Sequence, residues 1–102
     1  MPSINVPLIS IALADPTRFG ILRSISSCEM ISSHALCEMF GVTPATVSHH
    51  LQQLRLASLV VSSRDGRWRR HKVNREVLGA YVSALSKLAL VHTEAHEDSA
   101  SV

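Results

Sequence analysis

The stretch TPATVSHHLQQL, Thr43 to Leu54, decides how this chain folds. Threonine is favoured at helix N-caps and proline at the first helical position, so Thr43-Pro44 predicts the start of a helix. Apolar residues then recur at the spacing of a buried helical stripe: Val47, Leu51 and Leu54. The opposite face carries small, uncharged side chains, with Thr46 and Ser48 at its edges: Ala45, His49, Gln52 and Gln53. Such a face suits the edges of DNA bases.

The two adjacent histidines of this stretch do not form a shared site. Neighbouring residues on a helix point about 100° apart, so His49 and His50 cannot both face one metal ion. The same divergence makes Ser48 and His49 unsuitable as a nucleophile and its base. We therefore expect His49 to be a surface contact residue and His50 to be a partly buried packing residue.

Another helix and a short turn precede this one. A short helix is expected over about residues 32–40, and Gly41 after it is a typical left-handed C-cap. Two helices joined by a three- or four-residue turn containing glycine predict a helix-turn-helix, whose second helix enters the major groove of DNA. Upstream, Asp15 and the proline after it predict a further helix to about Ser26.

After Leu56 the hydrophobic period changes to that of strands. The segments LVVSSR and RWRRHKV flank Asp65-Gly66, a strong two-residue hairpin signal. A two-stranded ribbon at this place predicts a winged helix-turn-helix, in a fold that is mainly α with a small β-hairpin wing. Most basic side chains lie on the ribbon or at its end: Arg64, Arg67, Arg69, Arg70, Lys72 and Arg75. Such a stripe is expected of a phosphate-binding surface, and a merely solvated charged face is the alternative.

Two apolar helices near the ends of the chain exceed what one small domain can cover. The first is predicted from Val6 or Pro7 to Ala14. The last, capped by Asn74, is predicted from Arg75 to about Val91. The simplest use of the surplus apolar surface is a homodimer interface built from both helices.

Length and composition limit the other possibilities. The chain has 102 residues, a formal net charge of +2, 46% hydrophobic and 18% charged residues. We expect one domain over residues 1–92 and a disordered tail over residues 93–102. No apolar run reaches the roughly 18 residues of a membrane span, and no signal peptide is recognisable, so a cytoplasmic protein is expected. No phosphate loop, nucleophile elbow or carboxylate pair indicates an enzyme.

Three segments together resemble the ArsR/SmtB family of small bacterial winged-helix repressors: ALADPTRFGIL, FGVTPATVSHHLQQLRLASLV and RDGRWRRHKVN. The similarity covers roughly residues 11 to 90. It implies a symmetric dimer formed through the first and last helices. It also implies that this dimer binds double-stranded DNA at an inverted-repeat operator and releases it when an inducer binds.

The resemblance also implies which residues read DNA. The positions in and beside the second helix of the motif would be Thr43, Ala45, Thr46, Ser48, His49 and Gln52. Those of the wing would be Arg64, Arg67 and Arg69. Ala45 stands where the family usually has a polar residue, which leaves an apolar contact such as one to a thymine methyl. Arg70 and His71 stand where the family often has two tyrosines, which predicts a more basic ribbon.

The family's sensor sites are missing from this sequence. Arsenic- and cadmium-type members carry Cys-x-Cys where this chain has Ser32 and His34. Zinc-type members carry Asp-x-His where the last helix here begins with Asn74-Arg75-Glu76. Cys37 lies where some redox-responsive members keep one of two reactive cysteines, but the last helix holds no cysteine. A packed helix cysteine and a one-cysteine switch both remain open.

Other sensor candidates can be assembled from the remaining ligand-type residues. His34 and Cys37 share a helix face and could supply two metal ligands, with Cys28 or Glu38 contributing a further one. Two reduced thiols are expected rather than a disulfide. In the tail, His92 and His96 are weak metal candidates, with a solvated tail as the alternative.

The sequence therefore predicts a DNA-binding transcriptional regulator, most simply a homodimeric repressor. A winged-helix protein-interaction module without specific DNA binding is the alternative. No resident cofactor is indicated. A divalent metal, a metalloid and a redox signal all remain open as the inducer.

Overall fold

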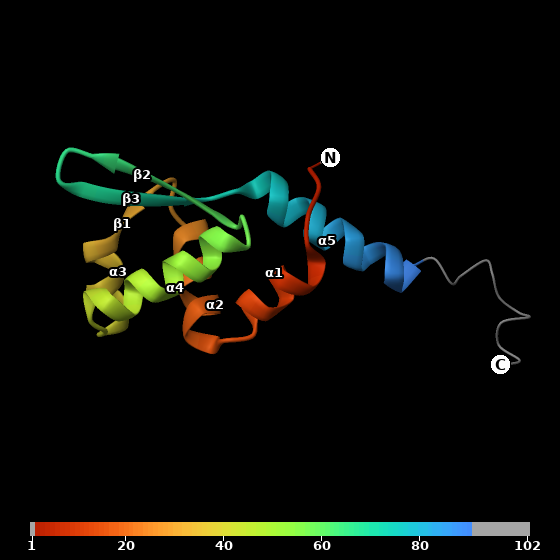
Figure 1. The fold of residues 1–102 in the computed structure, drawn as a ribbon, viewed down its shortest axis with the longest axis horizontal. Helices are drawn as coiled ribbons and strands as arrows, with labels where there is room; N and C mark the ends of the chain where they lie inside the picture. The colour runs from red at the N-terminus through yellow and green to blue at the C-terminus, as the bar shows by residue number, and fades with distance from the viewer. Residues whose placement is uncertain (1, 91–102) are drawn as a thin grey trace, which may run out of the picture.

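Five helices and three strands make up the computed structural model, which describes residues 2–90. In chain order they are α1 (Val6–Leu13), α2 (Pro16–Ser26), β1 (Ile31–Ser32), α3 (Ser33–Phe40), α4 (Pro44–Leu56), β2 (Val60–Asp65), β3 (Trp68–Val73) and α5 (Arg75–Leu90). Figure 1 shows the hairpin of β2 and β3 projecting at one end of the molecule and α5 at the other. The predicted mainly α fold with a β wing is confirmed.

Side-chain caps set where the helices begin. The side chains of Asp15, Ser32 and Thr43 each accept a hydrogen bond from the backbone N–H three residues later, at 2.9, 3.1 and 3.2 Å. Each satisfies one of the N–H groups that a helix start leaves without a partner. Helix α3 ends at Gly41 in the left-handed conformation, at φ 63°. The expected helix ends are thus confirmed to within one residue, except that the predicted end near Val91 lies outside the described residues.

The sheet differs from the predicted two-stranded ribbon. Strand β1 adds a third antiparallel strand, and the strand order is β1-β3-β2. The hairpin loop also differs, because Asp65 pairs with Trp68 and leaves Gly66 and Arg67 as the two loop residues. Asp65-Gly66 is therefore wrong as the loop. Gly66 adopts φ +64° at the first loop position, a conformation that glycine takes without steric cost.

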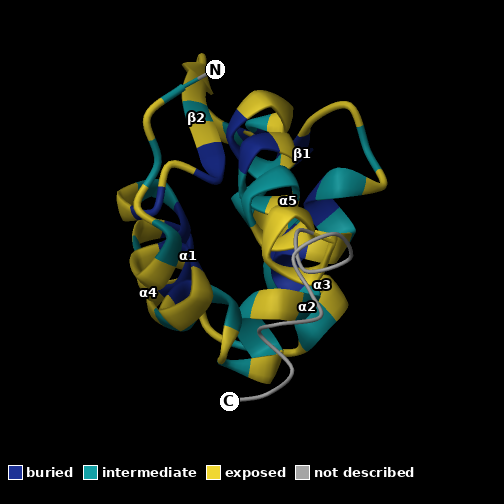
Figure 2. Ribbon diagram, turned by 90° about the vertical axis from the view of Figure 1, so that its right-hand side faces the viewer, coloured by how far each residue is buried: buried dark blue, intermediate teal, exposed yellow. Residues whose placement is uncertain are grey.

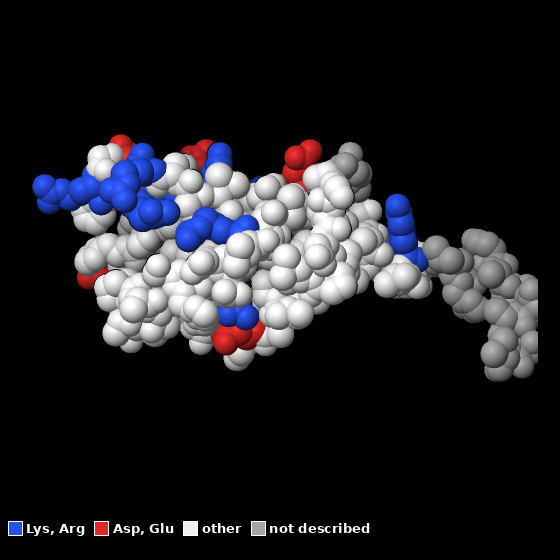
Figure 3. All heavy atoms as spheres, viewed as in Figure 1, with Lys and Arg blue, Asp and Glu red and all other residues white. Residues whose placement is uncertain are grey.

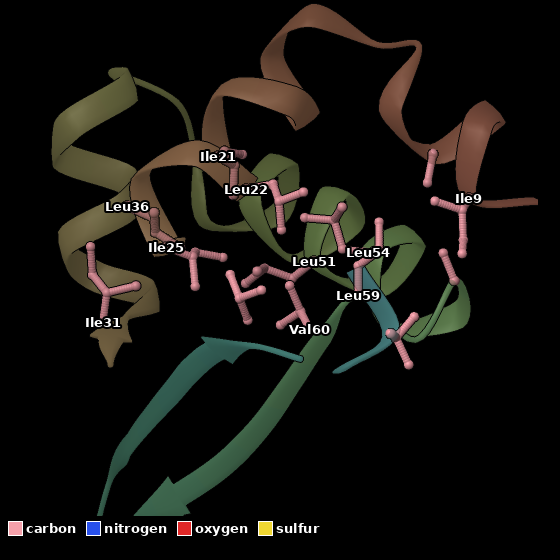
Figure 4. Packing of buried hydrophobic residues seen from close by; sticks show 14 of the residues in the cluster. Ile9, Ile21, Leu22, Ile25, Ile31, Leu36, Leu51, Leu54, Leu59 and Val60 are labelled. Atoms are coloured by element: carbon pink, nitrogen blue, oxygen red, sulfur yellow. The ribbon is translucent and has the colours of Figure 1, made fainter. Parts of the chain in front are cut away.

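The hydrophobic core lies where α2, α4 and the sheet meet (Figure 4). The predicted stripe of α4 is buried in it: Val47, Leu51 and Leu54 are each at most 2% exposed. Leu36 of α3 and Leu59 before β2 are fully buried as well. Each such side chain stabilises the fold by roughly 1.5–3 kcal/mol, so α4 is held rigidly by its inner face.

Helices α1 and α5 leave apolar side chains uncovered. On α5 only Val77 and Ala80 are buried, and Figure 2, which looks onto this end, shows little buried surface on the helix. Leu88 is 79% exposed and Ile11 of α1 is 65% exposed. None of the helices within residues 2–90 combines the length and hydrophobicity needed to cross a lipid bilayer.

Candidate nucleic-acid interface

The outer face of α4 carries the side chains predicted to read DNA. The exposed members of this set are Thr43, Ala45, Ser48, His49 and Gln52, while Thr46 is half-buried. The Thr43 hydroxyl accepts the Thr46 N–H at 3.2 Å and lies 3.0 Å from the Thr46 hydroxyl. These two threonines therefore stabilise the helix start as well as lining it. His49 and Gln52 offer hydrogen-bonding groups one turn further along the helix.

His50 packs on the other side of α4, as predicted. It is 8% exposed, and its Nδ1 lies 3.3 Å from a guanidinium nitrogen of Arg18. Because arginine can only donate, Nδ1 of His50 is the acceptor. Burial lowers the pKa of His50, against the opposing charge of Asp15. Arg18 also donates to the backbone oxygen of Ala12 at 2.6 Å, so this side chain connects α4 to the end of α1.

The wing concentrates positive charge at one end of the molecule (Figure 3). Arg64, Arg67 and Arg69 are all exposed. Arg64 stands directly opposite Arg69 across the β2–β3 pair, and like charges in that position repel. Arg70 differs, because its Nε lies 3.6 Å from a carboxylate oxygen of Asp65. A bound anion would relieve the Arg64–Arg69 repulsion, which is the electrostatic property expected of a phosphate-binding wing.

His71 lies inside the sheet's packing rather than on the basic surface, so the prediction of a more basic ribbon is wrong at this position. It is 1% exposed, with Nε2 2.7 Å from the Ser33 hydroxyl and Nδ1 2.7 Å from the Ser62 hydroxyl. Burial, followed by the charges of Arg55 and Arg69, lowers the pKa of His71 to about 4. The ring is therefore neutral near pH 7. Side chains two residues apart on a strand share a face, so the pairing of His71 with the apolar Val73 could have predicted that His71 is buried.

Two hollows flank Arg69 on the side of α3 and α4. The first, a cleft of about 290 Å³ between α4 and β3, is lined by Ser33, Pro44, Ser48, Leu51, Arg55, Arg69 and His71. The second, a groove of about 470 Å³, is lined by Ser33, His34, Cys37, Pro44, Arg67, Trp68 and Arg69. Arg55 was not among the predicted interface residues. No local pattern separates it from an ordinary solvated arginine near a helix end.

The sensor candidates are only partly brought together. His34 and Cys37 both line the groove beside Trp68, whose ring centre lies 6.0 Å from that of His34. Cys28 does not line it, and both cysteines are free and half-buried. His34 lies 3.5 Å from the carboxylate of Glu38. Across residues 2–90, no group of three or more His, Cys, Asp or Glu side chains is placed to hold a metal ion. His92 and His96 lie outside the described residues.

Comparison with known proteins agrees with this architecture. A family model described as a helix-turn-helix domain matches residues 13–63. The HTH-type transcriptional regulator KmtR of Mycobacterium tuberculosis is 46% identical over 54 residues, which are 53% of this chain and 41% of KmtR. The transcriptional repressor SdpR of Bacillus subtilis is 31% identical over 67 residues, which are 66% of this chain and 73% of SdpR. The chain thus spans less than half the length of KmtR.

A solved structure extends the similarity over most of the chain. It is the homodimeric winged helix-turn-helix DNA-binding domain of a possible ArsR-family transcriptional regulator from Mycobacterium bovis. The two chains superpose with a TM-score of 0.68 at 25% identity, over 90% of this chain and 84% of that one. All three names describe regulators rather than enzymes. From its helix-turn-helix, its wing and these relatives, the chain belongs to the ArsR/SmtB family of helix-turn-helix transcriptional regulators.

Proposed function

We propose that this protein is a sequence-specific, DNA-binding transcriptional repressor that acts as a homodimer on an inverted-repeat operator. The observation that carries the proposal is the arrangement at one end of the molecule. There the uncharged, hydrogen-bonding face of α4 lies beside a wing that carries Arg64, Arg67 and Arg69. A helix of this kind suits base edges in a major groove, and such a wing suits phosphates or a neighbouring minor groove. The names of KmtR and SdpR support the proposal.

The proposed contacts divide into two kinds. Specificity comes from α4, through Thr43, Ala45, Thr46, Ser48, His49 and Gln52. Affinity comes mainly from Arg64, Arg67 and Arg69 on backbone phosphates, and therefore falls steeply with salt. The domain covers residues 1–92 in this proposal, and a cytoplasmic location follows from access to DNA.

The homodimer is proposed to form through α1 and α5. The support is the uncovered apolar surface described above, which Ile11 and Leu88 exemplify. The homodimeric state of the Mycobacterium bovis domain adds to it. Two copies related by a two-fold axis would present two copies of α4, which is why the operator is expected to be an inverted repeat.

An inducer is proposed to release the DNA. Ser32 and His34 replace the thiolate pair of metalloid-responsive members, so the described residues do not fit that type of metal site. Cys37, a half-buried thiol at the edge of the groove, supports an oxidant instead. Metal, metalloid and oxidant are therefore to be tested separately against DNA binding.

Selection of bound duplexes from a random DNA pool tests the proposal, with reduced, metal-free protein. Enrichment of an inverted repeat is the expected result, and the enriched duplex then serves as the probe for zinc, arsenite and peroxide. No enrichment by an intact dimer would contradict specific DNA binding and favour a winged-helix interaction module.

A further inference from the structure

The cleft between α4 and β3 combines positive charge with hydroxyl groups. Arg55 and Arg69 bring two guanidinium groups to its lining, and Ser33 and Ser48 bring two hydroxyls. In the described part of the chain, no carboxylate forms an ion pair with either arginine. Cations and hydroxyl donors around one hollow, with no acid beside them, favour an oxyanion such as phosphate.

A chain of hydrogen bonds runs behind the cleft through the buried ring of His71. Arg55 donates to the Ser62 hydroxyl at 3.3 Å, and Ser62 lies 2.7 Å from Nδ1 of His71. The ring's other nitrogen, Nε2, lies 2.7 Å from the Ser33 hydroxyl. A neutral imidazole has one donor and one acceptor nitrogen. Ser62 accepts from Arg55 and keeps its own proton, which can go to Nδ1; in that tautomer Nε2–H donates to Ser33.

This order of donors has a consequence for the cleft. Once the Ser33 oxygen accepts from His71, the hydroxyl proton of Ser33 is left to donate elsewhere, and the cleft is the hollow that Ser33 lines. The lowered pKa of His71, at about 4, keeps the ring in the neutral form that this order requires. In this tautomer Ser33 accepts from His71 and is positioned to donate toward the cleft.

The position of the cleft indicates which phosphate would occupy it. If α4 enters a major groove and the wing reaches the adjacent minor groove, the backbone that separates these grooves must pass between α4 and β3. The cleft lies at that place, whereas Arg67 at the tip of the hairpin lies beyond it. The two features therefore contact different parts of the DNA.

We propose that the cleft holds one backbone phosphate of each operator half-site, bound by Arg55, Arg69 and the hydroxyls of Ser33 and Ser48, with His71 as the residue that positions Ser33. The inference rests on the proposed DNA-binding function and adds Ser33, Arg55 and His71 to it. It also adds a backbone contact to the role proposed for Ser48.

Operator duplexes in which single phosphates are replaced by neutral methylphosphonates test the proposal. One linkage per half-site should weaken binding by wild-type protein, and it should weaken binding by Arg55→Ala or Ser33→Ala less, because Arg69 and Ser48 still contact the phosphate in these variants. On unmodified operator we expect losses of about 30-fold for Arg55→Ala and about fivefold for Ser33→Ala. The salt slope should fall by about 2 per dimer only for Arg55→Ala. Matched controls are Arg23→Ala and Ser63→Ala, exposed residues that do not line the cleft.

The role of His71 has its own readout. The ¹⁵N shifts of wild-type protein should report the Nε2–H tautomer at pH 7, and His71→Phe should reduce the methylphosphonate effect as much as Ser33→Ala does. The Nδ1–H tautomer would overturn the positioning of Ser33 without any variant being made. If wild-type protein binds no duplex, the proposed function fails and this inference with it.

Two further outcomes would overturn the proposed phosphate site in the cleft while leaving the proposed DNA-binding function intact. An operator that is still bound, with the methylphosphonate profile unchanged in Arg55→Ala and Ser33→Ala, would overturn the cleft alone. Titration with inorganic phosphate in the absence of DNA should shift the Ser33 and His71 signals only at tens of millimolar. Saturation below about 1 mM would reassign the cleft to a free oxyanion.

Discussion

The two ends of the molecule leave opposite kinds of surface uncovered. At the wing end, Arg64 and Arg69 face each other across the hairpin and share no acid among the described ion pairs. At the other end, α5 and α1 expose Leu88 and Ile11. An anion would complete the wing end, because it would relieve the like-charge repulsion. The α5 end is completed by another apolar surface.

This separation means that the two proposed contacts can be disabled independently. The domain between the two ends has its own core, to which Leu88 and the wing arginines do not belong. A change at one end should therefore leave the other end, and the fold, intact.

The largest expected effect comes from the α5 end. Leu88→Asp should convert the dimer to a folded monomer, because an aspartate cannot be buried in an apolar interface without a large desolvation cost. Operator binding should fall by about 10² to 10⁴-fold, since the two half-sites are no longer bound by linked copies. Sedimentation and DNA titration measure the two effects. Lys87→Asp, one residue away and about 100° around the helix, should change neither. A dimeric Leu88→Asp protein would refute the α5 interface.

Acidification should destabilise the folded protein through His71, the buried histidine of β3. The pKa of His71 is about 4 in the folded protein and about 6.5 unfolded. The neutral buried ring therefore contributes its full stability above pH 6.5, and this contribution is lost as the pH falls toward 4. The loss reaches about 3 kcal/mol. Urea unfolding of wild type and His71→Gln from pH 7 to 4 isolates the contribution. Parallel curves for both proteins would mean that His71 is not buried as a neutral group.

The sequence was sufficient to predict most helix ends, because caps act locally. Asp15, Thr43 and Gly41 each impose a conformation through contacts within a few residues. Strand β1 could not be predicted this way. It has two residues, and it exists only because Ile31 and Ser32 pair with β3 about forty residues later.

The candidate site divides in the same manner. The outer face of α4 follows from helical period, and the arginines of the wing follow from composition. The cleft does not, because Ser33, Arg55 and His71 come from three separate elements and are joined only by packing. The hairpin loop was misplaced by one residue, since Asp65-Gly66 and Gly66-Arg67 both offer a glycine to a two-residue turn and only the strand register distinguishes them.

Charge removal at the wing tip should have a smaller effect than loss of the dimer. Arg67→Ala should weaken binding to operator and to random duplex equally, by about tenfold, because a phosphate contact carries no sequence information. The slope of log K against log salt should become shallower by about 2 for the dimer. Fluorescence titration from 50 to 300 mM salt measures both quantities. Unequal losses on the two duplexes would mean that Arg67 reads a base or a groove shape.

The smallest effect is expected from a substitution on the outer face of α4. It should appear only as a weaker preference for operator over random DNA. His49 is exposed on the proposed reading face, and its ring centre lies 5.6 Å from that of His50. His49→Ala should weaken operator binding by about fivefold, relax the preference at one base pair per half-site and leave binding to random duplex unchanged. Arg23→Ala, an exposed residue of α2 that lines neither the cleft nor the groove beside Trp68, is the control. Repeating the random-pool selection with both variants measures the change. If the control variant lost the preference at the same base pair, the effect would come from the general orientation of the protein on DNA and not from His49. If His49→Ala instead weakened binding to every duplex equally, His49 would be a contact to the DNA backbone. The division between a helix that reads bases and a wing that binds phosphates would then not hold at this residue.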